Sequence, residues 1–403
     1  MGIVNGRPLR VLAADDSAVM RGIMHKLFEQ HNNDKVSELP RMELCGVARD
    51  GVECLEAVKR LAPDVLVLDL EMPRMNGLDV LDRLRMENAA LPVIMCSAHT
   101  EHGARSTLEA LARGAADYVM KPGGQRDVDA ALVSLAHQLL PKIAALAKAA
   151  VRVNVKTNAR AHGTAAQKVR PTEQRGQAPI EVVVIGLSTG GPSALEQMLP
   201  KLPADFPVPI LIVQHMPKLF TGALAERLNK SCALRVQEAY EGAVVRPGVI
   251  WLAPGDAHME VAPRKTMLGE TVARGSRVHL HRQAPLNHCM PAVDYLFLSA
   301  ARMYGAGALA LVMTGMGSDG LDGARLVHEC GGVVLAQDEA TSAVWGMPGR
   351  VTEAGIADAT LPVTAIADAL RQRVSAGRGA NAGSMEFAVN VLAGHREVMH
   401  GMY

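Results

Sequence analysis

The sequence predicts an α/β protein with two domains, each built on a doubly wound parallel sheet. Three observations predict this class. The chain has 403 residues, which is more than one ordinary hydrophobic core accommodates. Short β-branched runs alternate with amphipathic stretches of helical period in both halves of the chain. Apolar residues make up 49% of the chain and aromatic residues only 3%, which is typical of many small helix–sheet contacts.

The charge balance and the cysteine pattern exclude several classes of protein. The 42 lysines and arginines nearly equal the 41 aspartates and glutamates, so the charge does not indicate nucleic-acid binding. The 6 cysteines form no CxxC pair and show no metal-ligand spacing with histidine, which indicates a reduced, cytoplasmic setting. The N-terminus lacks a secretion signal, and no apolar run approaches about 20 residues. We therefore expect no membrane insertion.

The first domain is expected over residues 8–147. Ser17 is placed to cap its first helix, and Pro63 ends the second helix. The five strands of this domain read RVLAADD, MELCGVA, DVLVLDL, PVIMCSA and DYVMKP.

The second domain is expected over residues 179–372, and the segments on either side of it lack sustained periodicity. Residues 148–178 contain many bases and one acid, Glu173, which is typical of a flexible linker. Residues 373–403 are interpreted as a tail to which no role is assigned. The strands predicted for the second domain read EVVVIGL, PVPILIVQHM, GVIWLAP and ALALVMTGM.

Acidic and basic side chains stand at the strand ends of the first domain. Asp15 and Asp16 follow the first strand, Asp69 ends the third, and Lys121 ends the fifth. The carboxyl ends of strands form the ligand edge of an open α/β sheet, so these groups should converge. Three carboxylates at one place repel one another unless a cation such as Mg²⁺ neutralises them. A helix cap and a plain turn are the alternative interpretation of the individual residues.

These motifs carry a family resemblance. The segments DDS and DLEMPRMNG, the strand-end Ser97 and the KP pair resemble the flavodoxin-like receiver domain of two-component response regulators. The resemblance implies that Asp69 accepts a phosphoryl group from a phosphohistidine of a partner kinase, and that Asp15 and Asp16 hold Mg²⁺ with it. The resemblance also implies that three residues report phosphorylation, namely Ser97, Tyr118 and Lys121.

A serine motif opens the second domain. The strand EVVVIGL runs directly into Ser188-Thr189-Gly190-Gly191-Pro192, which places a GxSxG pattern between a strand and a helix. A serine on such a turn is exposed near the positive end of a helix, where a developing oxyanion is stabilised. A phosphate-binding turn or a simple helix cap remains the alternative for this motif alone.

A serine nucleophile needs a base and an acid that orients the base. His215 follows the apolar strand PVPILIVQHM at the same sheet edge and is the predicted base. Asp319 follows the strand ALALVMTG and is the predicted orienting acid, with Asp322 as the competitor. The order Ser, His, Asp differs from the Ser, Asp, His order of α/β-hydrolases. The backbone N–H groups of Thr189 and Met316 are the predicted oxyanion donors, since glycines beside Met316 allow close approach.

Five motifs in order then identify the second half as a member of a family. The segments STGGP, QHMP, LAPGDAHM, TGMGSDG and AQDEATSAVWGMPG resemble the catalytic domain of chemotaxis protein-glutamate methylesterases. The resemblance implies a hydrolase that removes methyl esters from glutamates of chemoreceptors and deamidates glutamines, with Ser188, His215 and Asp319 as its triad. It implies a chemotaxis histidine kinase as phosphoryl donor and methyl-accepting chemoreceptors as substrates. The hydrolase itself is expected to need no cofactor, and the protein to be a monomer.

Two departures and two alternatives accompany this interpretation. Trp345 stands where a smaller aromatic residue is usual, and NHCMPAVD stands where a more basic segment is expected. A receiver that controls a non-catalytic adapter or a DNA-binding domain is one alternative, but no helix-turn-helix follows the linker and all three triad residues are present. A general acyl hydrolase is the other alternative, and it leaves the receiver unexplained.

Overall fold

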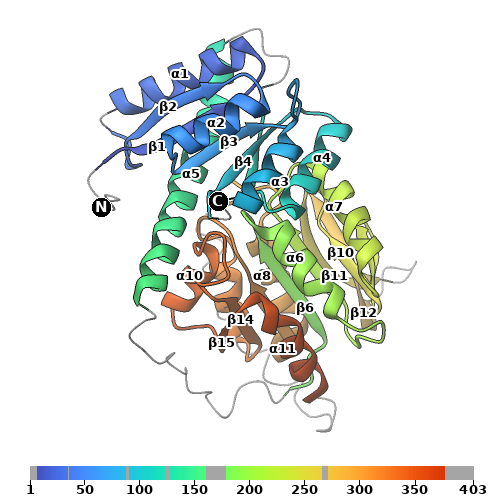
Figure 1. The fold of residues 1–403 in the computed structure, drawn as a ribbon. Coiled ribbons are helices and arrows are strands. Elements are labelled where there is room, and N and C mark those ends of the chain that lie inside the picture. Colours follow the sequence, from blue (N-terminus) through green and yellow to red (C-terminus); the bar gives the residue numbers. More distant parts are fainter. Residues whose placement is uncertain are drawn as a thin grey trace. The chain divides into compact units, whose positions relative to one another are not determined.

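A computed structural model describes residues 7–34, 36–87, 90–122, 128–159, 178–265 and 271–376 of the chain. The chain separates into two compact units, Met1–Ala166 and Gln167–Tyr403, and each is described by itself (Figure 1).

The first unit is a five-stranded parallel sheet with helices in the connections. The strand order is β2-β1-β3-β4-β5, so the chain reverses direction across the sheet between β1 and β3. This is the flavodoxin-like order, in which ligands bind outside the carboxyl ends of the strands at the reversal point. The predicted fold class is therefore confirmed for this unit. The strands are β1 Leu9–Ala14, β2 Met42–Ala48, β3 Val65–Asp69, β4 Val93–Ser97 and β5 Asp117–Met120.

The helices of the first unit begin where their sequences provide caps. The Ser17 side chain accepts a hydrogen bond from Met20 N, and the Asp50 carboxylate accepts from two backbone N–H groups of α2. Helix α1 buries Ile23, Met24, Leu27 and Phe28, whereas Val19, which the same apolar spacing places inward, is 67% exposed. The helices are α1 Ala18–Asn33, α2 Gly51–Leu61, α3 Gly77–Glu87, α4 Glu101–Ala112 and α5 Val128–Ala159.

Helix α5 extends past the end expected for the first domain. It continues to Ala159, twelve positions beyond residue 147, so the segment expected to be a flexible linker from residue 148 is helical at its start. Alanine, lysine and arginine favour helix even where apolar periodicity has ended. The rest of that linker, 160–177, lies outside the described residues, as does most of the tail, 377–403.

Within the described residues, one stretch also has the length and composition of a membrane span, although none was expected. This stretch is Asp129–Ala149, and 44% of its apolar window is buried inside the protein. Polar groups fasten it to β5: Lys142 Nζ lies 3.0 Å from Asp117 Oδ2 and donates to Tyr118 O at 2.6 Å. Buried core helices have the same composition, and Leu139 of this stretch is fully buried.

The second unit is built on a seven-stranded sheet in which every pair is parallel. The order is β15-β14-β13-β6-β7-β10-β8, so the chain starts in the middle at β6 and reverses between β6 and β13. The second half of the predicted fold class is thereby confirmed. The strands of this sheet are β6 Val182–Leu187, β7 Ile210–Gln214, β8 Arg235–Glu238, β10 Val249–Leu252, β13 Ala308–Val312, β14 Val333–Gln337 and β15 Ala359–Leu361.

Both faces of this sheet are buried, as a parallel sheet requires. Alternate residues such as Val184, Leu211 and Ala310 join one core with Phe297 of α8, while their neighbours on each strand are buried on the other face. The helices are α6 Gly191–Met198, α7 Lys218–Ser231, α8 Val293–Tyr304, α9 Leu321–Glu329, α10 Met347–Glu353 and α11 Val363–Ala376, with short 3₁₀ turns at Leu199–Lys201 and Gly305–Gly307.

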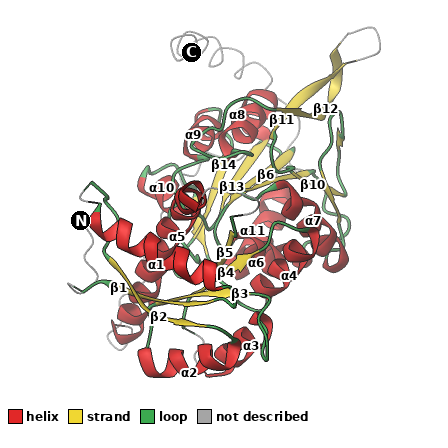
Figure 2. Cartoon of the chain, turned by 90° about the horizontal axis from the view of Figure 1, so that it is seen from above, coloured by secondary structure: helices red, strands yellow, loops and turns green. Residues whose placement is uncertain are grey.

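A three-stranded antiparallel sheet completes the second unit and was not predicted. Its order is β11-β12-β9, and β11 packs on α8 (Figure 2). Met259, Val261 and Val278 of this sheet are buried in the same core as the main sheet. The strands are β9 Val244–Val245, β11 His258–Lys265 and β12 Thr271–His281.

The close approach of β6 to α8 generates a prediction. A methyl group at Gly186 would overlap the side chain of Val293, so Gly186→Ala should lower the free energy of unfolding by about 1–3 kcal/mol. Val293→Ala should partly rescue it. Both tryptophans, Trp251 and Trp345, lie in the second unit, so tryptophan fluorescence during urea unfolding follows that unit alone.

The matched control is Gly222→Ala in α7, where the nearest atom to an added Cβ is 3.7 Å away. This change should be neutral or stabilising, because alanine favours helix over glycine. Equal losses for the two glycine variants, or no rescue by Val293→Ala, would contradict the packing argument.

Candidate active site and acidic cluster

The three residues of the predicted triad all follow central strands of the second unit. Ser188 follows β6, His215 follows β7 and Asp319 lies in the loop after β13. In the sheet β6 lies between β13 and β7, so Ser188 stands at the point where the strand order reverses. This is the place where open α/β sheets bind ligands.

Hydrogen bonds hold the Ser188 turn against both neighbouring strands. Ser188 N donates to Thr314 O at 2.9 Å, and Gly191 N donates to Ser188 O at 2.8 Å. Gly190 has φ of 79°, which a residue without Cβ adopts freely, and α6 begins directly after it. The turn leaves Ser188 half-buried at the N-terminus of a helix.

Gln214 links this turn to His215. Its Nε2 donates to Ser188 O at 2.9 Å and to His215 O at 3.2 Å, and His215 N donates to Leu187 O at 3.0 Å. The backbones of the predicted nucleophile and the predicted base are therefore joined through one buried amide. Sequence reasoning missed Gln214, although its place directly before His215 at the end of β7 was a signal.

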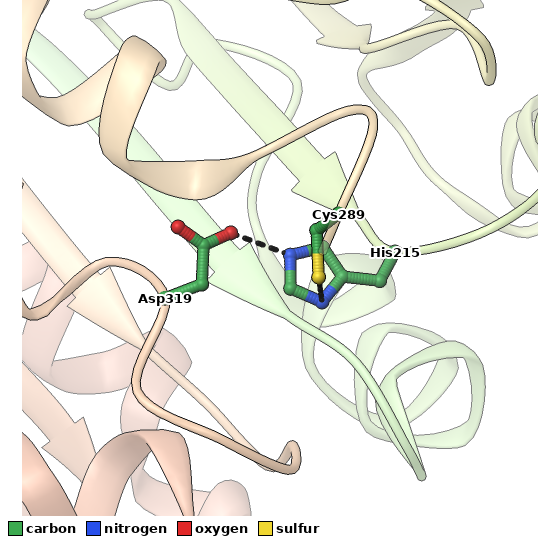
Figure 3. Close-up of side chains that lie close together, drawn as sticks. All are labelled: His215, Cys289 and Asp319. Atoms are coloured by element: carbon green, nitrogen blue, oxygen red, sulfur yellow. Dashed lines mark hydrogen bonds and ion pairs between the residues drawn. The ribbon is translucent and has the colours of Figure 1, made fainter. Parts of the chain in front are cut away.

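His215 contacts Asp319 and not Asp322. His215 Nε2 donates to Asp319 Oδ2 at 2.7 Å, as Figure 3 shows. The Asp319 carboxylate is 2% exposed, whereas Asp322 lies in the first turn of α9 and is exposed. Of the two candidate acids, Asp319 is the one that the fold brings to the imidazole.

The Asp319 carboxylate also caps helix α8. Val293 N donates to Asp319 Oδ2 at 2.6 Å, Asp294 N to Oδ1 at 3.2 Å, and Asn287 Nδ2 to Oδ1 at 3.3 Å. Burial opposes ionisation of Asp319, but the hydrogen bond from His215 and these backbone donors outweigh it and lower the pKa of the carboxyl. Asp319 is therefore held as a carboxylate.

The contact that lowers the pKa of Asp319 raises the pKa of His215. Burial disfavours the imidazolium, but the hydrogen bond with Asp319 and the contact with Cys289 outweigh burial and raise the pKa of His215. The protonated imidazole is thus stabilised between a carboxylate and a thiol.

Cys289 was missed by sequence reasoning. Its Sγ lies 3.4 Å from His215 Nδ1, so both ring nitrogens of His215 have partners (Figure 3). The two residues are 74 positions apart, so no local spacing could connect them. The only signal was the unusual segment NHCMPAVD that contains the cysteine.

Asp294 is a second buried acid behind the site that was also missed. It is 2% exposed, Gly323 N donates to its Oδ1 at 2.8 Å, and Asn287 Nδ2 donates to its Oδ2 at 3.1 Å. Burial and the neighbouring Asp319 carboxylate raise the pKa of Asp294 to about 7. Asp294 therefore supports the loop that holds Asp319 without adding a second full charge near it at neutral pH.

The loop of Gly315 to Gly317 lies directly beside Ser188. A Cβ built on Gly315 would be 2.8 Å from the Cβ of Ser188, so only glycine allows this approach. Met316 follows at once in the chain. Thr189 is buried, and its carbonyl accepts a hydrogen bond from Thr314 Oγ1 at 2.8 Å. The oxyanion roles of the Thr189 and Met316 N–H groups stay predictions.

The carboxylates of the first unit meet at the equivalent edge. Asp15 and Asp69 are buried and Asp16 is exposed, and one oxygen from each lies within 4.8 Å of the others. Lys121 Nζ lies 2.9 Å from Asp15 Oδ2 and 2.7 Å from Asp69 Oδ2. One ammonium beside three carboxylates leaves negative charge unbalanced, and an all-oxygen donor set suits Mg²⁺. The residues present therefore fit the magnesium ion that the sequence predicts.

Electrostatics in this cluster oppose the ionised form of Asp69. Burial raises the pKa of Asp69 to about 6; Lys121 counteracts this and the Asp15 carboxylate reinforces it. Burial by itself would lower the pKa of Lys121, but its contacts with Asp69 and Asp15 raise that pKa. The contacts with Lys121 thus offset part of the unfavourable burial of the Asp69 charge.

The predicted reporter residues lie at the edge of this cluster. Lys121 N donates to Ser97 O at 2.7 Å, which joins the ends of β4 and β5. The Ser97 hydroxyl accepts from Thr107 Oγ1 at 2.7 Å and donates to Gly103 O at 3.3 Å, so it is engaged with α4. The Tyr118 ring is buried beside Lys142 of α5, with Nζ 5.1 Å from its centroid. The switch roles of Ser97 and Tyr118 stay predictions.

The fold and the two clusters define a class of protein: a receiver domain joined to a second α/β unit that brings a histidine–aspartate pair and a serine to the ends of its central strands. Comparison with known proteins agrees. Residues 11–133 match the family model described as response regulator receiver domain, and residues 183–370 match the model described as CheB methylesterase.

Two relatives that match over nearly their whole length carry the same name. The protein-glutamate methylesterase/protein-glutamine glutaminase of Trichodesmium erythraeum is 41% identical over 91% of this chain and 99% of the relative, and that of Pyrococcus horikoshii is 39% identical over 93% and 96%. The crystal structure of the Thermotoga maritima CheB methylesterase catalytic domain is 40% identical, covers 48% of this chain and 99% of that chain, and has a TM-score of 0.45. The chain belongs to the protein-glutamate methylesterase/protein-glutamine glutaminase family.

The raised pKa of Asp69 generates a prediction. A carboxyl whose folded pKa lies above its unfolded value of 3.8 stabilises the fold below that value, and this contribution is lost as pH rises through about 6. Asp69→Asn keeps the neutral form at every pH. It should therefore raise the stability of the first unit by roughly 1–3 kcal/mol above about pH 7 and by little near pH 4.

Calorimetry of both proteins in a chelator, across this pH range, measures the difference. Asp16→Asn is the matched control, since Asp16 is exposed and its replacement should change stability much less. A pH-independent difference for Asp69→Asn would show that ionisation of Asp69 is not the cause.

Proposed function

We propose that this chain hydrolyses glutamate methyl esters, and deamidates glutamines, on the cytoplasmic helices of chemoreceptors under the control of its receiver. The observation that carries the proposal is the His215–Asp319 hydrogen bond at the strand-order reversal beside Ser188. The names of relatives that match over nine tenths of the chain support the substrate class.

The arrangement assigns a role to each ring nitrogen of His215. Nε2–H is held by Asp319, so Nδ1, which faces the Cys289 thiol, is the nitrogen proposed to accept a proton. Ser188 Oγ attacks the ester carbonyl as its proton passes to His215 Nδ1, and a tetrahedral oxyanion forms. The imidazolium returns the proton to the departing methoxide, which leaves as methanol. For a glutamine side chain the leaving group is ammonia.

The acyl-enzyme is then hydrolysed by the same groups in reverse order. Water gives a proton to His215 Nδ1 and attacks the acyl carbonyl, and the imidazolium protonates Ser188 as the carboxylic acid leaves. The N–H groups of Thr189 and Met316 are proposed to stabilise the oxyanion in both steps. The N-terminus of α6 next to Ser188 and the close approach of Gly315 support that assignment.

In the receiver, Asp69 is proposed to accept the phosphoryl group from a chemotaxis histidine kinase. Asp15, Asp16 and Asp69 would hold Mg²⁺, which neutralises charge on the acceptor and donor oxygens when bound. Lys121, already in contact with Asp69, is placed to pair with a phosphoryl oxygen and to leave Asp15. The backbone link from Lys121 N to Ser97 O would transmit that movement to β4 and α4.

The triad assignment predicts the effect of three substitutions. Ser188→Ala and His215→Ala should each lower methanol release from methylated receptor fragments by at least about a thousandfold, because nucleophile and base act as a unit. Asp319→Ala should cost less. Phosphorylation at Asp69 should persist in Ser188→Ala, since the two sites belong to separate units.

Asp322→Ala is the matched control for the acid, because Asp322 is exposed on α9 and lies three positions away. Its rate should stay within about twofold of the unmodified protein. Near-normal turnover by Ser188→Ala, or equal losses in Asp319→Ala and Asp322→Ala, would refute the assignment.

The pH dependence of kcat/KM provides a separate prediction. His215 must be neutral to take a proton, and Asp319 raises its pKa, so activity should rise with pH along a limb set by His215. Asp319→Asn removes that negative charge. It should move the limb to lower pH and also lower the plateau, whereas a purely structural loss would lower the plateau without moving the limb.

Control by the receiver is tested by comparing three forms of the protein. A fragment that begins near Gln177 should hydrolyse receptor esters faster than the unphosphorylated full-length protein, if the unphosphorylated receiver restrains access to Ser188. A tenfold change in the accessible population needs only about 1.4 kcal/mol. Acetyl phosphate with Mg²⁺ should accelerate the full-length protein but not Asp69→Asn. A fragment no faster than the unphosphorylated chain would exclude restraint by the receiver.

A further inference from the structure

A thiol, an imidazole and a carboxylate converge behind the proposed nucleophile. One ligand atom each from His215, Cys289 and Asp319 lies within 4.8 Å of the other two. Among the residues that the structure describes, this group and the acidic cluster of the receiver are the two that could hold a metal ion. The two differ in chemistry, because the receiver offers oxygen alone and this group offers sulfur and nitrogen.

The separation of sulfur and nitrogen matches a metal-bound pair. Cys289 Sγ and His215 Nδ1 are 3.4 Å apart. A tetrahedral Zn²⁺ with a Zn–S bond of about 2.3 Å and a Zn–N bond of about 2.0 Å places these atoms about 3.5 Å apart. The observed separation is therefore close to that of two ligands of one tetrahedral metal ion.

The imidazole is also oriented as a metal ligand is. A histidine that binds a metal through one nitrogen usually donates its other N–H to a carboxylate, which fixes the ring and increases its basicity. His215 donates Nε2–H to Asp319 at 2.7 Å, so Nδ1 carries the lone pair that faces Cys289. Asp319 is held in turn by three further donors, from Val293, Asp294 and Asn287.

We propose that Cys289 Sγ and His215 Nδ1, supported by Asp319, form a binding site for Zn²⁺ or a similar thiophilic divalent ion that reversibly blocks the hydrolase. Binding replaces the proton between sulfur and nitrogen: the Cys289 thiol loses H⁺ to solvent and the thiolate and Nδ1 each form a bond to the metal. Soft sulfur and imidazole ligands favour zinc over magnesium, so the Mg²⁺ that serves the receiver should not compete.

Inhibition follows because the metal and the substrate proton need the same atom. Nδ1 is the nitrogen proposed to take the proton of Ser188, and a metal-bound Nδ1 takes none. This consequence rests on the proposed function, whereas the metal site itself does not. Binding should strengthen as pH rises, since a proton is released.

Cobalt titration of the full-length protein tests the site without reference to activity. Co²⁺ bound by a thiolate shows an intense sulfur-to-metal charge-transfer absorption, and Co²⁺ on the carboxylates of the receiver does not. We expect this band to saturate at one equivalent with Mg²⁺ in excess and to disappear when Zn²⁺ is added. Cys289→Ser, Cys289→Ala and His215→Ala should lack the band, and Asp319→Asn should bind more weakly.

The matched control is Cys330→Ser, since Cys330 is another half-buried free cysteine of the same unit and lies outside the cluster. It should keep the band. Absence of the band in the unmodified protein, or its persistence in both Cys289 variants with near-native circular dichroism, would overturn the site.

The inhibition is measured as the ratio of methanol release with and without Zn²⁺ for each variant. Saturating Zn²⁺ should lower the rate of the unmodified protein and of Cys330→Ser by about tenfold or more, with recovery on addition of a chelator. With Zn²⁺ present, Cys289→Ser should keep most of the rate that the same variant shows without metal. A cobalt band without inhibition would overturn the blocking role, and absence of methanol release before metal is added would instead contradict the proposed function.

Discussion

The carboxylate of Asp319 is the group on which the rest of the hydrolase site depends. It is buried after β13 and accepts hydrogen bonds from His215 and from two backbone N–H groups at the start of α8. An ionised carboxylate is costly to bury unless its lone pairs are satisfied, and here a helix N-terminus and an imidazole satisfy them. One interaction thus anchors α8, selects the His215 tautomer and leaves Nδ1 directed away from the acid.

The two units place their acidic side chains at the same point of the sheet topology, but the two environments shift the pKa values of these acids in opposite directions. In each, the side chains of the proposed site follow strands at the point where the strand order reverses. Asp69 and Asp319 are almost equally buried, at 3% and 2% exposure, yet their pKa values shift in opposite directions. Asp319 is surrounded by donors, whereas Asp69 faces Asp15 across one ammonium. The first environment keeps the Asp319 carboxylate ionised. The second suits a carboxyl that binds a cation or accepts a phosphoryl group.

His215 belongs both to the proposed catalytic triad and to the proposed metal site. Its Nε2 is committed to Asp319, so the proton of the nucleophile, the Cys289 thiol and a metal ion would share Nδ1. Because all three would bind His215 Nδ1, one could replace another without a conformational change. The family relationship supports the chemistry of the hydrolase, while the proposed metal site is argued from the contact of Cys289 with His215.

Local sequence determined the strands that carry the site, because burial on both faces of a parallel sheet requires continuous β-branched runs such as EVVVIGL and PVPILIVQHM. It therefore also placed Ser188, His215 and Asp319 at one edge. It did not reveal the antiparallel β11-β12-β9 sheet, the extension of α5 to Ala159, or the contacts made by Cys289 and Asp294. Those depend on packing between segments far apart in the chain, where neither periodicity nor spacing records which side chains meet. Only the tertiary structure decided that Asp319 and not Asp322 meets the imidazole, because that choice depends on where the loop after β13 turns into α9.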